Sequence, residues 1–154
     1  MPASNPMIPQ GTLNRLRGAV TFVGNGPAGN VSALNVTASF LAKAGITLTL
    51  EGEATDIIGT MAGTVTSPAP YQMCSVVVNI LKTQNLAAVY KAQMELNTVI
   101  GDFSVTPDAS TLPSYYVNNA AIESVKELPF NGSDPAFSVT LKGYYSINSS
   151  LWNF

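Results

Sequence analysis

Two groups of residues have the types and spacing that enzymes use. The glycines of the run Gly24–Gly29 follow a strand-like segment in a G-x-G-x-x-G pattern, and Glu51 lies downstream, as in dinucleotide-binding folds. That chemistry needs a long helix to begin at the loop, so that the helix N-terminus meets the pyrophosphate. Residues 30–37 are instead rich in β-branched and turn residues, and Pro27 removes a backbone N–H from the loop. The pattern therefore predicts a turn between strands.

The second group is the acidic cluster of Glu51, Glu53 and Asp56. On a strand, Glu51 and Glu53 lie on one face, which is an arrangement that paired carboxylates use for acid–base catalysis. A substrate pocket would also need aromatic platforms and convergent polar groups, and the surrounding sequence offers neither. We therefore expect a solvated strand edge or loop here.

The composition lacks most of the other residues that catalytic and metal sites use. The chain has no histidine, the commonest general base and metal ligand, and one cysteine, Cys74. A single cysteine allows neither an internal disulfide nor a cysteine-based metal site. Because Cys74 lies in the apolar run Met73–Val78, we expect it to pack as a small hydrophobic residue. No catalytic residue, metal or cofactor is predicted.

Few charges are present to keep the surface in water. The 154 residues are 46% hydrophobic and 10% charged, with 7 Lys and Arg against 9 Asp and Glu. This balance excludes an intrinsically disordered chain and disfavours a nucleic-acid-binding surface. Asn, Ser and Thr supply 41 residues, so we expect much of the surface to contact protein. Neither a signal peptide nor a membrane-spanning segment is predicted.

Alternating hydrophobicity predicts a mainly β domain. Strands are expected over Ala19–Val23, Ile46–Leu50, Ile57–Thr66, Met73–Leu81 and Val99–Val105, within Tyr116–Lys126, and over Phe137–Asn148. In the second of these, Ile46, Leu48 and Leu50 are expected to face inward and the threonines outward. The fold class is an antiparallel β-sandwich or barrel with one flanking α-helix.

That helix is expected over about residues 84–97, with Thr83 as its N-cap. Its apolar stripe consists of Leu86, Val89, Tyr90 and Met94. Residues 1–154 are expected to form a single domain with an extended N-terminal arm over about residues 1–12, which carries three prolines.

The run Ile57–Tyr71 contains fifteen residues without charge. Gly59 and Gly63 indicate β-bulges or close backbone approach. One interpretation is a core strand with a turn. The other is a contact between subunits, because an exposed apolar edge promotes aggregation unless a partner covers it. The residues predicted to make that contact are Ile57, Ile58, Met61, Val65, Pro68, Pro70 and Tyr71.

Five segments spread over nearly the whole chain share one resemblance. They are Pro9–Leu16, Val65–Tyr71, Leu81–Ala87, Phe130–Pro135 and Leu141–Tyr145. Together they resemble the tail tube proteins of bacteriophages with contractile tails. The resemblance implies a β-barrel or sandwich with a flanking helix, six copies in a ring, and rings stacked into a hollow tube inside a sheath. It also implies strand pairing around the ring and an N-terminal arm that lies on an adjacent protomer.

The resemblance further implies a place and partners. The chain would be synthesised in the bacterial host cytoplasm and would reside in the virion tail without membrane anchoring. It would contact copies of itself and the sheath, baseplate and tail terminator proteins, and DNA would pass through without specific binding. A net charge of −2 repeated six times gives a ring of −12, which repels phosphate. Glu51, Glu53 and Glu123 are the expected lumen-facing residues.

Two alternatives remain open at this stage. The inner tube of a phage-like injection or secretion machine would share the fold, and neighbouring capsid genes would distinguish the two. A soluble β-sandwich module that binds a small molecule or sugar would be a monomer with a well-formed pocket, whereas a tube subunit must form oligomers. An enzyme is the least supported class, because so few titratable groups are available.

Overall fold

The fold is organised around two long antiparallel strands, β5 (Tyr71–Leu81) and β8 (Ala136–Ser146). The computed structural model describes residues 17–22, 32–107, 112–127 and 130–151. Within it the two strands pair without a register shift along their whole length. Successive side chains point to opposite faces. The buried set on one face is Cys74, Val76, Val78, Ile80, Phe137, Val139 and Leu141. Each fully buried Val, Leu or Ile contributes about 1.5–3 kcal/mol.

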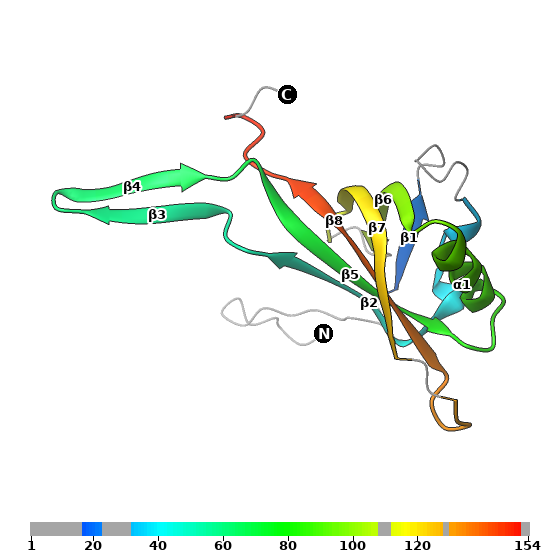
Figure 1. Cartoon of the computed structure of the whole chain (residues 1–154). Helices are drawn as coiled ribbons and strands as arrows, with labels where there is room; N and C mark the ends of the chain where they lie inside the picture. The colour runs from blue at the N-terminus through cyan, green and yellow to red at the C-terminus, as the bar shows by residue number, and fades with distance from the viewer. Residues whose placement is uncertain (1–16, 23–31, 108–111, 128–129, 152–154) are drawn as a thin grey trace, which may run out of the picture.

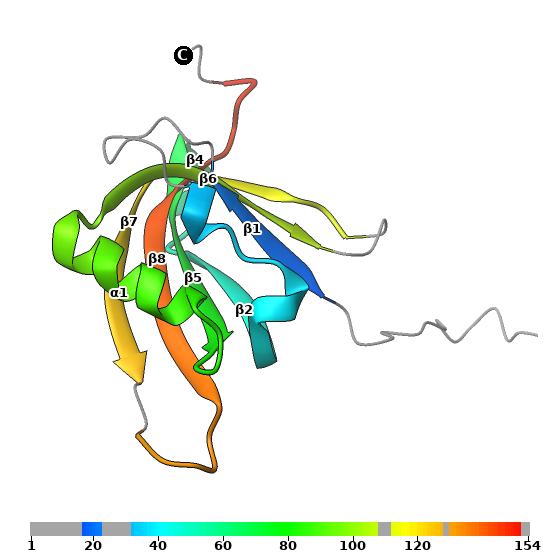
Figure 2. The same cartoon turned by 90° about the vertical axis from the view of Figure 1, so that its right-hand side faces the viewer.

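Four further strands extend this pair into a six-stranded antiparallel sheet of order β1-β6-β7-β8-β5-β2. Their bounds are Gly18–Phe22 for β1, Leu41–Glu51 for β2, Val99–Pro107 for β6 and Tyr115–Glu127 for β7. The sheet curls into a half-barrel around the core (Figure 2). The predicted mainly β fold with a flanking helix is confirmed, in the form of one curled sheet.

The single α-helix of the described residues, α1 (Leu86–Leu96), packs on the core side of the sheet (Figure 2). Leu86 and Tyr90 are buried, and Val89 and Met94 pack against the core, so the predicted apolar stripe is confirmed. The Tyr90 hydroxyl donates a hydrogen bond of 2.8 Å to the Leu34 carbonyl. That carbonyl belongs to the short 3-10 helix η1 (Ser32–Leu34); a second, η2 (Ala38–Phe40), precedes β2.

The helix begins later than predicted. Thr83 is not its N-cap: Asn85 holds that position, and its side chain makes no capping hydrogen bond. The delay follows from the end of β5, since a turn closed by the Gln84 N–H and the Leu81 carbonyl comes between strand and helix. Burial of the apolar stripe therefore stabilises α1 more than its cap does.

Strand β2 is longer than predicted and is irregular. Ile46 and Leu48 pack against the core, and the intervening threonines are exposed, as expected. Leu50 lies opposite the buried Cys74 and so also faces the core side as predicted, but it lies near the end of the strand and 38% of it is exposed. The register shifts between Leu41 and Ile46, around Gly45 with its φ of 65°.

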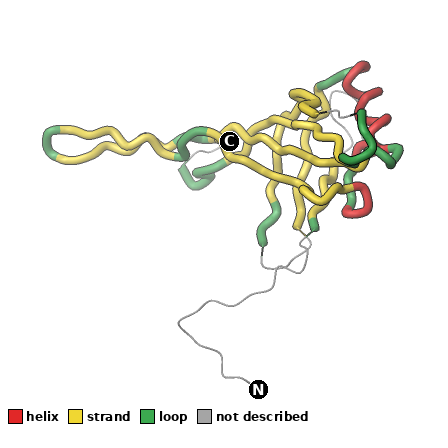
Figure 3. The backbone as a smooth tube through the Cα atoms, turned by 90° about the horizontal axis from the view of Figure 1, so that it is seen from below, coloured by secondary structure: helices red, strands yellow, loops and turns green. Residues whose placement is uncertain are grey.

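The uncharged run forms a hairpin of two strands, β3 (Thr55–Thr60) and β4 (Gly63–Pro68). The prediction of one strand with glycine bulges is wrong. Gly63 lies at the turn with φ of 153°, and a Cβ on Gly59 would meet no described atom within 4 Å. The hairpin projects away from the half-barrel (Figures 1 and 3). The core-strand interpretation is also wrong, because its side chains from Asp56 to Ser67 are exposed.

Two predictions fall outside the described residues. The N-terminal arm over about residues 1–12 is one, and the glycine run Gly24–Gly29 is the other.

Gly143 sets how closely β8 approaches β7. A Cβ there would lie 2.7 Å from both the Asn118 carbonyl oxygen and Val117 Cγ1. We therefore expect Gly143→Ala to lower the free energy of unfolding by about 1–3 kcal/mol, as overpacking does, measured by urea denaturation. Gly132→Ala is the matched control, because no described atom lies within 4 Å of a Cβ at that position. Equal midpoints for the two variants would contradict the close approach.

Candidate functional site

The first candidate surface is the projecting hairpin, formed by β3 and β4. Ile58 and Val65 are cross-strand partners on one of its faces, and Ile57 is paired with Thr66 on the other. Exposed fractions are 65% for Ile57, 49% for Ile58, 54% for Val65 and 109% for Met61 at the tip. Pro68 and Pro70 are half-buried near its foot, and Tyr71 begins β5 with half its surface exposed. Most predicted contact residues thus lie together on one exposed element.

The foot of the hairpin is tied to the C-terminal end of β8 by Asn148. Its side-chain amide donates to the Ala69 carbonyl at 2.7 Å and lies 3.5 Å from the Ala54 carbonyl. Asn148 has φ of 54°, a conformation that asparagine tolerates better than most residues. The Ile147 N–H also donates to the Pro70 carbonyl at 3.1 Å. Sequence reasoning did not identify Asn148, because this contact joins residues far apart in the chain.

The second candidate surface is the outer face of the sheet, on the side opposite the buried valines. Strand alternation brings polar side chains of four adjacent strands to it: Thr47, Thr49, Ser75, Asn79, Ser124 and Ser138. Some of them bond to one another. The Ser138 hydroxyl donates to Asn79 Oδ1 at 2.7 Å, and Asn79 Nδ2 donates to the Gly45 carbonyl at 3.0 Å. The face is therefore rich in hydroxyl and amide groups that are partly committed to one another.

One ion pair crosses this outer face. Glu51 on β2 accepts a hydrogen bond from the Ser75 hydroxyl at 2.7 Å and pairs with Lys142 Nζ at 3.1 Å. The hydrogen bond with Glu51, followed by its negative charge, raises the pKa of Lys142 above the ordinary 10.5. A nearby carboxylate on Glu123 of β7 acts in the same direction. The pair joins three neighbouring strands, β2, β5 and β8.

Of the three acidic residues predicted to face a lumen, two lie on strands of the sheet and one lies in a turn. Glu51 and Glu123 lie on the strands of the outer face, and their charges act on the same lysine. Glu53 lies in the exposed turn between β2 and β3, and Asp56 is on the projecting hairpin. The expected solvated edge or loop agrees with the exposure of Glu53 and Asp56.

A structural contact made by Asp102 was missed by sequence reasoning. Its carboxylate accepts a hydrogen bond from the Asn119 N–H at 2.8 Å and one from the Tyr116 hydroxyl at 3.4 Å. Asn119 has φ of 50° at an irregularity in the pairing of β7. Asp102 of β6 thus links to β7 where the pairing of the two strands shifts register, and only the cross-strand register reveals this contact.

Cys74 lies in the core, and burial, followed by the charge of Glu51, raises the pKa of its thiol. The prediction of a small hydrophobic residue is confirmed. In the described part of the chain, no three His, Cys, Asp or Glu residues come together as a group that could hold a metal ion. Over the same residues, no helix has the length and hydropathy needed to cross a membrane.

The foot of the hairpin can be tested by Asn148→Gly. This change removes the two amide contacts and keeps a residue suited to positive φ. We expect faster hydrogen exchange at the Ala69 and Ile147 amides and no change at Val78 in the core. Asn119→Gly is the matched control, since it also replaces an asparagine of positive φ but lies on β7. Unchanged exchange at the foot in Asn148→Gly would contradict the role of Asn148.

The ion pair can be tested by Glu51→Gln. Because the folded pKa of Lys142 is raised, the pair stabilises the fold fully below pH 10.5, and the effect is lost as pH rises through the raised value. We expect the pKa of Lys142, followed by NMR at its side-chain nitrogen, to fall in Glu51→Gln. Glu53→Gln removes a carboxylate from the adjacent turn and should leave it unchanged. An unshifted titration in Glu51→Gln would show that the pair does not form.

The resemblance to tail tube proteins depends on the five sequence segments described above. No protein-family model and no curated protein matches the chain. The case for a function therefore depends on those segments, on the projecting hairpin and on the outer face of the sheet.

Proposed function

We propose that this chain is a structural subunit that assembles with copies of itself into stacked rings and so forms the inner tube of a phage tail. The resemblance to tail tube proteins implies six copies in each ring. The tube is a conduit for the genome, and the chain performs no catalysis. The projecting hairpin is the single observation that carries this proposal.

The hairpin carries the proposal because it is not stable as an isolated element. A two-stranded hairpin is at best marginal in water, and this one exposes Ile57, Ile58, Met61 and Val65 together. An uncovered apolar ribbon with free strand edges attracts other strands. A second protein surface that covers it would stabilise it and remove that risk. Copies of the same chain supply such a surface wherever the protein is concentrated.

The free edge of β2 supports a second kind of contact between copies of the chain. β2 is the last strand in the sheet order, so no described strand pairs with its outer edge. Its backbone N–H and C=O groups there are available for strand pairing with a neighbour. A protein with both an open strand edge and a projecting hairpin can form contacts within a ring and contacts between rings.

The outer face of the sheet supports the role of conduit. It is rich in hydroxyl and amide groups, and Glu51 neutralises Lys142 there, so this lysine is held away from phosphate. Together with a net charge of −2 per chain, this surface favours passage of DNA over binding. Glu51 and Glu123 are then lumen residues. Sheath, baseplate and tail terminator proteins are the proposed partners, and the virion tail is the proposed location.

The proposal is tested by the double change Met61→Asp with Val65→Asp. Both side chains are exposed, so we expect folding by circular dichroism to be unchanged. We expect sedimentation and negative-stain electron microscopy to show loss of the rings or tubes that the unmodified protein forms. The matched control, Ser133→Asp with Ser149→Asp, adds the same charge at exposed positions outside the hairpin.

Assembly of the hairpin variant at the unmodified yield would contradict the proposal. Unfolding of the hairpin variant alone would contradict the exposed placement of Met61 and Val65.

A further inference from the structure

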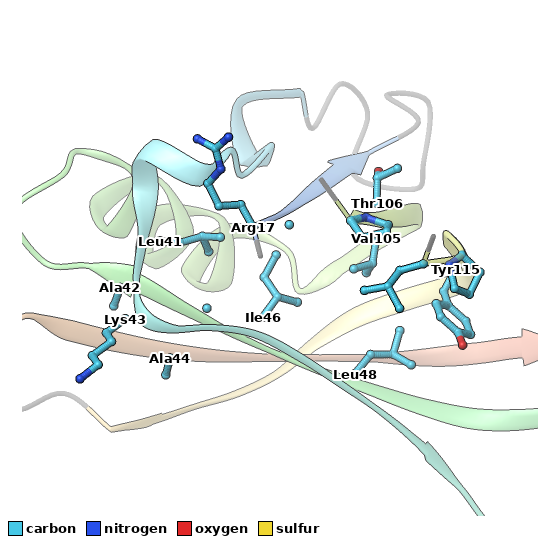
Figure 4. Close-up of a pocket in the computed structure, with 15 residues that line it drawn as sticks. Arg17, Leu41, Ala42, Lys43, Ala44, Ile46, Leu48, Val105, Thr106 and Tyr115 are labelled. Carbon is cyan, nitrogen blue, oxygen red and sulfur yellow. The ribbon is translucent and has the colours of Figure 1, made fainter. Parts of the chain in front are cut away.

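Two features of the described residues are not used by the proposed function. One is a groove between β2 and the ends of β1 and β6, which is lined by apolar side chains such as Ile46 and Leu48 (Figure 4). Nothing in the described residues indicates what covers this groove. The other is the exposed loop of residues 130–135, which leads into β8 at the bottom of Figure 2 and contains the pair Asn131 and Gly132.

The side chain of Asn131 is held by the residues that follow it. Its oxygen, Oδ1, accepts hydrogen bonds from the Ser133 N–H at 3.0 Å, the Ser133 hydroxyl at 3.2 Å and the Asp134 N–H at 2.9 Å. The Asp134 carboxylate accepts in turn a hydrogen bond of 2.9 Å from the Ala136 N–H, at the start of β8. The fold therefore places three donors on one side-chain oxygen.

An asparagine followed by glycine can react with its own backbone. The Gly132 nitrogen loses its proton to hydroxide and attacks Cγ of Asn131, and the new C–N bond closes a cyclic succinimide. The bond from Cγ to Nδ2 breaks, and Nδ2 takes up a proton from water and leaves as ammonia. Water then opens the succinimide at either carbonyl, which gives aspartate or isoaspartate at position 131. The reaction consumes water and needs neither an oxidant nor a reductant.

The three donors point at the atom on which charge develops in this reaction. When the Gly132 nitrogen attacks Cγ, an electron pair moves onto Oδ1 of Asn131, which becomes an oxyanion. Hydrogen bonds to a charged oxygen are stronger than those to a neutral one. The donors therefore stabilise the transition state more than the starting amide. Gly132 also has no Cβ to hinder the approach.

We propose that Asn131 is a site of spontaneous deamidation, which the loop promotes by stabilising the oxyanion on Oδ1. The reaction adds one negative charge to a chain whose net charge is −2. Isoaspartate also lengthens the main chain before Gly132 by one carbon atom. Modified chains would therefore accumulate with the age of the protein. This inference does not depend on the proposed assembly.

Incubation of the purified protein at mildly alkaline pH, in water labelled with heavy oxygen, tests the site. Aspartate and isoaspartate formed during the incubation carry the label, and peptide mass spectrometry assigns it to a residue. The second Asn-Gly pair, Asn25 and Gly26, lies outside the described residues and is followed in the same digest as an internal reference. The unmodified chain is also followed unfolded in guanidinium chloride.

We expect labelling at Asn131 to be faster in the folded protein than in the unfolded one. Ser133→Ala should slow it in the folded protein by about two- to fivefold, because one donor is lost, and Ser133→Thr, which keeps a hydroxyl, should restore it. Gly132→Ala should also slow it, because the added Cβ hinders the attack. That Cβ would meet no described atom within 4 Å, so the fold should be retained. Labelling at Asn25 should be the same in every variant.

Absence of label at Asn131 in samples that carry it at Asn25 would overturn the site. A slower reaction at Asn131 in the folded chain than in the unfolded chain would show that the fold protects the residue, which overturns the promotion by the loop. An undiminished rate in Ser133→Ala would overturn it as well. Circular dichroism checks the fold of each variant. If Ser133→Ala does not fold, the comparison of the folded and unfolded unmodified chain decides.

Discussion

The uninterrupted pairing of β5 with β8 is the constraint on which the rest of the structure depends. Eleven matched positions fix which residues face the core and which face outward, because a slip of one residue would exchange the two faces. β2 and β7 then add to either side, and each pairs with register shifts. The buried valines of β5 and the outer-face groups Ser75, Asn79 and Ser138 are thus consequences of one register.

This register also determines which surfaces the described residues leave uncovered. The core face is satisfied within the chain, since Tyr90 and Leu86 cover it from the helix. The outer face, the free edge of β2 and the hairpin have no such cover in the described residues. Asn148 holds the foot of the hairpin against β8, so the hairpin extends from the body in a defined direction. A subunit of this form is suited to repetition, and the proposed tube uses each uncovered surface once.

Sequence reasoning found the elements whose pattern is local. The alternation of β8, the β-branched run of β5 and the stripe of α1 were all predicted, because burial on one face leaves a period in the sequence. The β structure of residues 57–66 was predicted, but as one strand with bulges instead of a hairpin, since Gly59 and Gly63 fit a bulge as well as a turn. Asn148, Asp102 and the ion pair of Glu51 with Lys142 were not predictable. Each joins residues that only the folded register brings together, and burial leaves no period at such positions.

The central claim is that copies of this chain assemble through surfaces that the monomer leaves uncovered. Electron microscopy of the unmodified purified protein, with size-exclusion chromatography of the same sample, tests it most directly. The account predicts hollow tubes or stacked rings, with the hairpin buried between subunits. A monodisperse monomer at high concentration that also fails to extend from added tail baseplates would contradict it.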